Sequence, residues 1–130
     1  MQALARRDLT TAELDERLAR VGVSGEVRAE VTERLRVARY VDDGRTALER
    51  AGRLAGRGLG DTAIRADLEG RGVSPDIVEQ AISALEPEDV RAVRLAAALG
   101  GGARAARALT RKGFEAETIE RTVEAVADDG

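Results

Sequence analysis

Hydrophobic residues recur along this chain at intervals of three and four, and no stretch alternates apolar and polar residues as a strand would. The two prolines, Pro75 and Pro87, stand where a helix can begin, and glycines follow most of the periodic segments, as at helix C-termini. The pattern therefore predicts an all-α protein of about nine helices. These are expected over residues 1–7, 11–21, 25–38, 43–57, 62–71, 75–85, 87–99, 103–112 and 115–127.

One arrangement recurs three times: an apolar residue, three others, a leucine, three others, a glycine and a further apolar residue. It occurs at Leu14, Leu18, Gly22 and Val23, at Ile64, Leu68, Gly72 and Val73, and at Ala105, Leu109, Gly113 and Phe114. The glycine allows the left-handed conformation that ends a helix, and the apolar residue after it folds back onto the last turn. A second amphipathic helix follows each time, so each match predicts a helix pair.

A longer helix precedes the second and third pairs, which predicts tandem three-helix repeats. We expect repeat 1 over residues 1–38 with a shortened first helix, repeat 2 over 39–86 and repeat 3 over 87–130. Stacked repeats share apolar faces and give an elongated, curved body. The alternative is a nine-helix globule in which the helix–glycine–helix pattern recurs by chance.

Composition excludes several classes of site. The chain has no histidine or cysteine, which rules out a zinc finger, a thiol nucleophile, a disulfide framework and a Ser–His–Asp triad. Aromatic residues are 2% of the chain, too few for a platform on which bases stack. We therefore predict a binding protein that is not an enzyme and has no cofactor. No apolar run reaches the roughly 20 residues that span a bilayer, and a signal-peptide core is not evident, so we expect a cytoplasmic protein.

Two predicted helices carry stripes of arginine. The first stripe is Arg50, Arg53 and Arg57, and the second is Arg104, Arg107 and Arg111 with Lys112 beside it. Residues at these spacings share a helix face, and no acidic residue occurs between positions 100 and 114. Each stripe could bind phosphates or an acidic protein surface, or could be a solvated face. The net charge of −3 conceals this basic segment, because acidic residues gather after it.

Other candidate features have structural interpretations. Asp42 and Asp43 could contribute to a metal site, but no third ligand is near in sequence. We expect Asp42 to cap a helix over 43–57 and Asp43 to lie in its first turn, at the positive helix end. The segment Gly100–Gly102 lacks the residues of a phosphate loop and is expected to be a hinge or a slack loop. Tyr40 and Phe114 are expected to anchor repeat junctions.

The residues between positions 40 and 73 form an aromatic–aliphatic–Asp–Asp segment, an alanine, an arginine with two glycines, and a helix–glycine turn. These residues are Tyr40, Val41, Asp42, Asp43, Ala47, Arg57, Gly58, Gly60, Ile64, Leu68, Gly72 and Val73. This pattern resembles the central repeat of the RecX family, although Thr46 stands where that family usually has an aromatic residue. The segments 4–14 and 111–114 look like the family's first and last repeats, so the resemblance covers nearly the whole chain.

RecX proteins regulate the RecA recombinase. The resemblance implies that this chain is a negative regulator in DNA repair, recombination and the SOS response. It would bind in the groove of the RecA–single-stranded DNA filament and inhibit strand exchange, ATPase and co-protease activity. It also implies that eight signature residues fix the repeat geometry: Tyr40, Asp42, Asp43, Gly58, Gly60, Ile64, Leu68 and Gly72. No membrane or small-molecule partner is expected. The alternative is a helical module that binds DNA directly through its arginine stripes.

Overall fold

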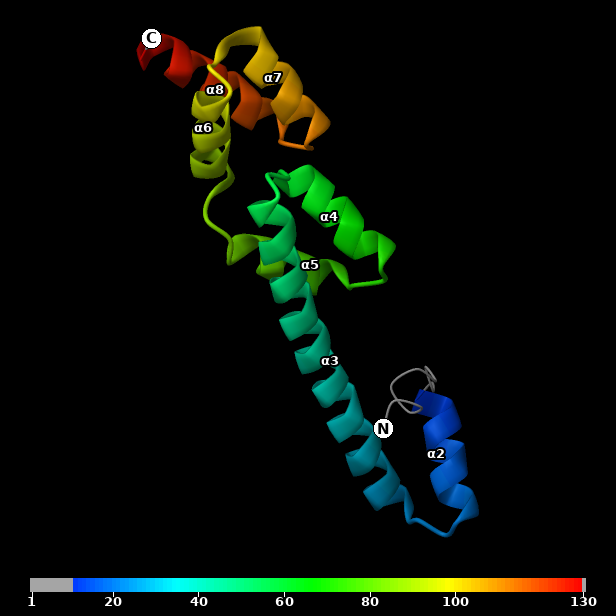
Figure 1. Ribbon diagram of the computed structural model, residues 1–130. Helices are drawn as coiled ribbons and strands as arrows, with labels where there is room; N and C mark the ends of the chain where they lie inside the picture. Colours follow the sequence, from blue (N-terminus) through cyan, green and yellow to red (C-terminus); the bar gives the residue numbers. More distant parts are fainter. Residues whose placement is uncertain (1–10, 130) are drawn as a thin grey trace. The chain divides into compact units, whose positions relative to one another are not determined.

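The computed structural model describes residues 11–129, and the predicted helix over 1–7 lies outside this range. The described residues form seven α-helices and no strand, which confirms the predicted all-α class (Figure 1). The helices are α2 (Thr11–Arg20), α3 (Gly25–Gly56), α4 (Asp61–Gly70), α5 (Pro75–Ser83), α6 (Glu88–Ala98), α7 (Gly102–Arg111) and α8 (Ala116–Asp129). Within these residues, no helix has both the length and the apolar character that crossing a membrane requires.

The predicted break between residues 38 and 43 is wrong, because α3 continues through it as one helix of 32 residues. The intervening segment contains neither proline nor glycine, so nothing interrupts the hydrogen bonds from each N–H to the carbonyl four residues earlier. Asp42 therefore lies inside a helix and does not cap one. Merging the two predicted helices also explains why the described residues contain fewer helices than expected.

The three predicted helix–glycine turns are confirmed. Gly22, Gly72 and Gly113 have φ angles of 88°, 84° and 81°, in the left-handed region that favours glycine. The apolar residue after each glycine donates its backbone N–H to a carbonyl five residues earlier, as in the bond of 3.1 Å from Phe114 to Leu109. Local chemistry thus ends the first helix of each pair and reverses the chain.

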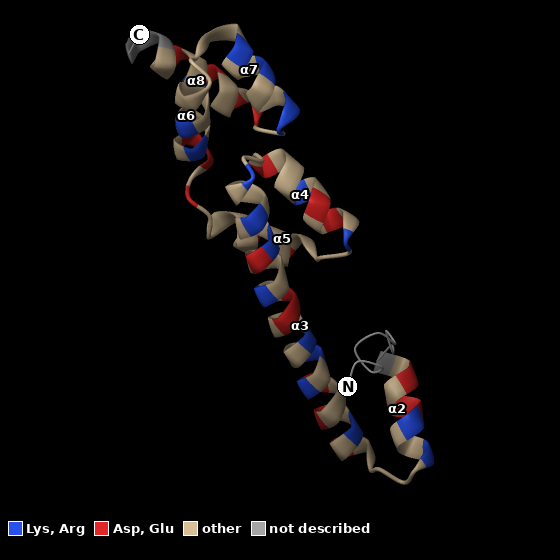
Figure 2. Cartoon of the chain, viewed as in Figure 1, with Lys and Arg blue, Asp and Glu red and all other residues tan. Residues whose placement is uncertain are grey.

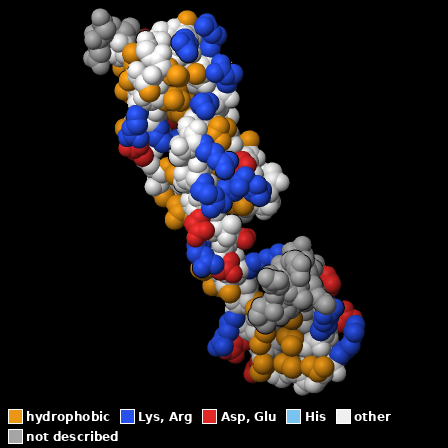
Figure 3. Space-filling model, viewed as in Figure 1, with side chains coloured by type: hydrophobic (Ala, Val, Ile, Leu, Met, Phe, Trp, Pro, Cys, Tyr) orange, Lys and Arg blue, Asp and Glu red, His pale blue; other side chains and the backbone are white. Residues whose placement is uncertain are grey.

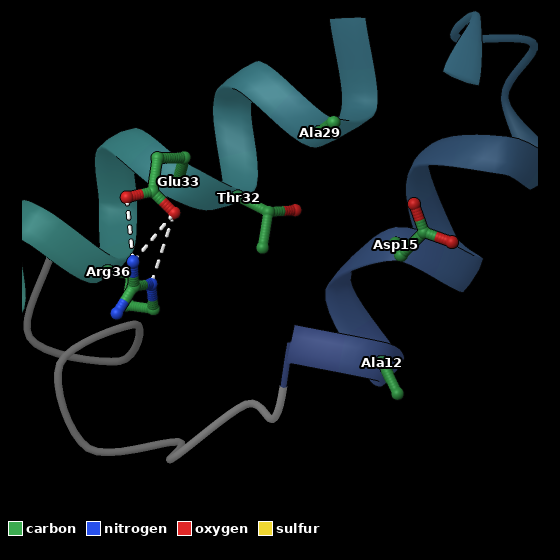
Figure 4. A pocket seen from close by; sticks show the side chains of 6 residues that line it. All are labelled: Ala12, Asp15, Ala29, Thr32, Glu33 and Arg36. Atoms are coloured by element: carbon green, nitrogen blue, oxygen red, sulfur yellow. Dashed lines mark hydrogen bonds and ion pairs between the residues drawn. The ribbon is translucent and has the colours of Figure 1, made fainter. Parts of the chain in front are cut away.

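The chain divides into two compact units, residues 1–42 and 43–130. In the first unit, Arg28 joins the helix pair, because its guanidinium donates to the Asp15 carboxylate and to the Val23 carbonyl at 2.8 Å each. A groove of about 550 Å³ lies between α2 and α3 (Figure 4). Its wall includes Thr32, whose buried hydroxyl has no hydrogen-bond partner among the described residues. No side chain described in this unit is fully buried.

The second unit contains two hydrophobic cores. The first joins the end of α3 to α4 and α5 and consists of Ala47, Ala51, Leu54, Ile64, Leu68, Ile77, Val78, Ala81 and Ile82. The second joins α6, α7 and the turn before α8 and consists of Ala92, Ala96, Ala105, Leu109 and Phe114. Alanines make up much of both cores. The repeat limits at 38, 86 and 130 stay a prediction, and three consecutive helical segments around each core are consistent with it.

Candidate partner-binding face and the helix junction that holds it

The segment after α3 lies directly against the turn that follows α7. Gly60 donates its N–H to the Lys112 carbonyl at 2.8 Å, and Thr62 donates to the Gly113 carbonyl at 3.0 Å. A side chain at Gly60 would place its Cβ 2.5 Å from the Phe114 backbone, which is closer than real Cβ contacts allow. Gly60 is therefore required by a close approach of two backbones that are far apart in sequence.

Glu88 holds this junction from inside. Its side chain is buried and its carboxylate accepts hydrogen bonds from the Asp61 N–H and the Thr118 hydroxyl, at 2.6 Å each. It also accepts from the Glu115 N–H at 3.3 Å. The carboxylate therefore faces the N-terminal ends of both α4 and α8, where unpaired N–H groups and the helix dipoles favour a negative charge.

A second, partly buried pair flanks Glu88. Arg91 donates to the Asp61 carboxylate and to the Leu59 carbonyl, the latter at 3.0 Å. Burial raises the pKa of Asp61, and the hydrogen bond from Arg91 offsets only part of this effect. Oxygen atoms of Asp61, Glu88 and Glu115 lie within 4.8 Å of one another. Because protein donors already engage Asp61 and Glu88, we interpret the cluster as a hydrogen-bonded joint between helices.

The second arginine stripe lies on the exposed face of α7. Arg104, Arg107 and Arg111 are exposed, while Ala105 and Leu109 on the same helix face the core. None of the three arginines forms an ion pair with any residue that the structure describes. Their charges are therefore available to a partner, whereas most other arginines in these residues are paired.

The first stripe is divided by the tertiary structure. Arg50 makes a two-pronged pair with the Asp67 carboxylate on α4, at 2.5 and 2.9 Å. The Arg50 guanidinium holds the pKa of Asp67 below its ordinary value. Arg53 and Arg57 are exposed and have no ion pair within residues 11–129. Arg50 thus joins α3 to α4, and the other two stay accessible.

Lys112 brings the ends of the two stripes together. Its ammonium nitrogen lies 3.5 Å from the Arg57 carbonyl, and its side chain passes within 3.6 Å of the position a Cβ would take at Gly58. Figure 2 marks Lys and Arg positions along α7 and neighbouring helices of the same unit, and Figure 3 shows Lys and Arg side chains gathered on this face. We call the following residues the basic face: Arg53, Arg57, Arg104, Arg107, Arg111 and Lys112. Sequence spacing predicted each arginine stripe, but it did not predict that Lys112 lies beside the end of the first stripe.

The remaining signature residues differ in their surroundings. Ile64 and Leu68 are fully buried core residues. Tyr40 is 47% exposed and lies outside both cores, whereas Phe114 is buried at the junction. Asp42 and Asp43 are exposed on α3.

The middle residue of the triple glycine is packed against α8. Gly100, Gly101 and Gly102 all have positive φ, and Gly101 is buried. A Cβ on Gly101 would lie 2.7 Å from Val126 of α8. Of the two predicted interpretations, the slack loop does not fit this close contact.

The described residues therefore define an all-helical protein with helix–glycine–helix pairs, a buried polar junction and a basic face. No family model matches the chain. It is 33% identical over 88 residues to the regulatory protein RecX of Deinococcus radiodurans, covering 68% of this chain and 42% of the relative. It is 38% identical over 90 residues to the regulatory protein RecX of Syntrophotalea carbinolica, covering 68% of this chain and 58% of the relative. The chain belongs to the RecX family. It spans about half the length of these curated relatives.

Proposed function

We propose that this chain is a negative regulator of the RecA recombinase. It binds in the groove of the RecA–single-stranded DNA filament and limits strand exchange, ATP hydrolysis and co-protease activity. The observation that carries this proposal is the similarity to two proteins named regulatory protein RecX. The partner and the inhibition follow from the family resemblance of the residues between 40 and 73.

The basic face supports a role in binding. Its cations have no carboxylate partners among the described residues, so binding an acidic surface breaks no internal ion pair. The junction around Glu88 fixes α4 and α8 beside α6, which reduces the ordering cost of binding. Clustered charge of one sign also accelerates association, and salt weakens that effect.

Charge reversal on α7 tests the proposal. We expect the triple variant Arg104→Glu, Arg107→Glu, Arg111→Glu to bind RecA filaments at least tenfold more weakly than the unchanged protein. Co-sedimentation with filaments on single-stranded DNA measures binding, and the ATPase rate of the filament measures inhibition.

The matched control reverses three exposed arginines that already have glutamate partners: Arg20, Arg34 and Arg36. This control changes the net charge equally and should bind normally. Unchanged inhibition by the α7 variant would show that α7 is not the contact surface. Failure of the unchanged protein to bind or inhibit the filament would refute the proposed function itself.

Direct DNA binding is the second candidate, and the unpaired cations of the basic face are the observation that favours it. Titration of labelled single-stranded DNA without RecA separates the two. Direct binding would weaken steeply with salt, with a slope in log–log form of roughly −0.7 per phosphate contact. The regulator proposal expects weak binding to DNA alone and much tighter binding to the filament.

A further inference from the structure

A groove of about 380 Å³ lies between the end of α3, the helix α6 and the turn before α8. Its floor is apolar and consists of Ala55, Leu95, Ala98 and Phe114. The α3 side of the groove ends in Gly56 and Gly58, which contribute no side chain to that edge. A Cβ on Gly56 would have no atom within 4 Å. The volume is at the low end of the range for ligand pockets and is sufficient for one or two apolar side chains.

Charge around this groove is predominantly positive. Glu86 on the rim is neutralised by Arg94, with bonds of 2.9 and 2.7 Å, and Arg91 is held by Asp61. At the Gly58 end, however, Lys112 has no carboxylate partner within the described residues.

Arg57, between the two lining glycines, also lacks a carboxylate partner among the residues that the structure describes. The groove therefore has an apolar lining, with the Lys112 side chain beside Gly58 at one end and Arg57 preceding Gly58 in the chain.

We propose that this groove binds an apolar side chain from an acidic segment of a protein partner, whose carboxylates meet Arg57 and Lys112. The inference rests on the function proposed above, which makes that partner a RecA subunit of the filament. Burial of one apolar side chain supplies the non-directional part of the affinity. Charge-assisted hydrogen bonds from the ammonium and guanidinium groups fix the direction of the segment.

The chemistry of the groove favours a protein segment over a nucleic acid strand. A phosphate backbone has no apolar group to place on a floor of alanine and leucine. Bases would need an exposed aromatic ring for stacking, and Phe114 is only 6% exposed. An acidic segment with an apolar anchor satisfies both the floor and the cations.

Filling the groove tests the inference. Gly56→Leu places a side chain at the open edge, and Gly52→Leu makes the same change one turn earlier on α3, where the site is equally open but does not line the groove. We expect Gly56→Leu to raise the dissociation constant for RecA filaments about tenfold and Gly52→Leu to leave it unchanged. Far-UV circular dichroism and the urea midpoint should show that both variants are folded.

A second measurement does not depend on RecA. An octapeptide of Asp and Glu with one central Leu is added to the labelled protein, and the methyl signals of Leu95 and Ala98 are followed by NMR. We expect these signals to shift with the Leu peptide, to shift much less when its Leu is replaced by Ala, and to stay still in Gly56→Leu.

The outcomes separate the two proposals. If the unchanged protein binds filaments and Gly56→Leu binds equally well, the groove is not the contact and the regulator proposal stands. If filaments are not bound at all, the regulator proposal fails, and a methyl response to the Leu peptide still identifies a groove for acidic segments. If no peptide shifts the methyl signals, or single-stranded DNA shifts them instead, the groove inference is wrong.

Discussion

The side chain of Glu88 accepts hydrogen bonds from three donors at the N-terminal ends of two helices, α4 and α8. A buried carboxylate is costly unless hydrogen bonds replace its water, and here the N-terminal ends of α4 and α8 provide them. Gly60 allows the two backbones to approach at this junction, because a Cβ at this position would collide with the Phe114 backbone. At the scale of residues, the junction therefore depends on one charge and one missing side chain.

Removing the Glu88 carboxylate should destabilise the protein more than removing the exposed Asp89 carboxylate beside it. We expect Glu88→Ala to lower the free energy of unfolding by roughly 2–4 kcal/mol, because it leaves buried donors unpaired. Asp89→Ala breaks only an exposed pair with Arg121 and should cost less than about 1 kcal/mol. Urea denaturation measures both. Equal losses for the two variants would show that Glu88 does not hold the junction.

The long helix α3 is the element in which sequence pattern and structure disagree. The pattern placed a helix start at residue 43, since the two aspartates resemble a cap and a first turn. In the structure these residues are internal, and Gly44 follows them within the helix with open space around it. Helix propagation needs no cap where neither proline nor a left-handed glycine interrupts it.

Substitutions at Gly44 distinguish one helix from two. In a continuous helix, Gly44→Ala should raise the free energy of unfolding by about 0.5–1 kcal/mol, and Gly44→Pro should lower it by about 3 kcal/mol. If a new helix began at residue 43, proline would be tolerated in its first turn. Urea denaturation and far-UV circular dichroism decide between these cases. Similar stability of the proline and alanine variants would contradict the continuous α3.

Across the whole molecule, ion pairs link helices and make stability depend on pH. The pKa of Glu79 is lowered by a hydrogen bond from Arg65, and the pKa of Glu86 is lowered by a hydrogen bond from Arg94. The pKa of Asp67 is lowered in the same way by a hydrogen bond from Arg50. Burial instead raises the pKa of Asp61. The three lowered groups favour the folded state when ionised, and Asp61 acts in the opposite sense.

We therefore expect the urea midpoint to fall as the pH drops below the ordinary pKa values of 4.5 for glutamate and 3.8 for aspartate. In that range the carboxylates of Asp67, Glu79 and Glu86, whose pKa values are lowered in the folded protein, take up protons in the unfolded chain first. Acid therefore favours unfolding. Glu79→Gln should make the fall shallower, while Glu69→Gln, at an exposed position without an ion pair among the described residues, should leave it unchanged. A midpoint that stays constant between pH 5 and pH 3 would contradict the expectation.

Sequence alone determined the features that depend on near neighbours. The turns at Gly22, Gly72 and Gly113 depend on two local features. The glycine adopts a left-handed conformation, and the N–H of the next residue donates to the carbonyl five residues earlier in the chain. The sequence pattern was therefore enough to predict them. The same local signals predicted the all-α class and the positions of the arginine stripes. The family resemblance also rested on residues close together in the chain.

Only the tertiary structure decided how distant residues meet. Glu88 contacts donors 27 and 30 residues away, and no local pattern distinguishes it from an ordinary first-turn acid. Arg50 and Arg57 have the same spacing signal, yet Asp67 engages the first and leaves the second exposed. Lys112 joins the two stripes only because α7 ends beside α3. Hydrogen bonds along a helix are fixed by positions in the chain, whereas pairing between helices is fixed by how their apolar faces pack.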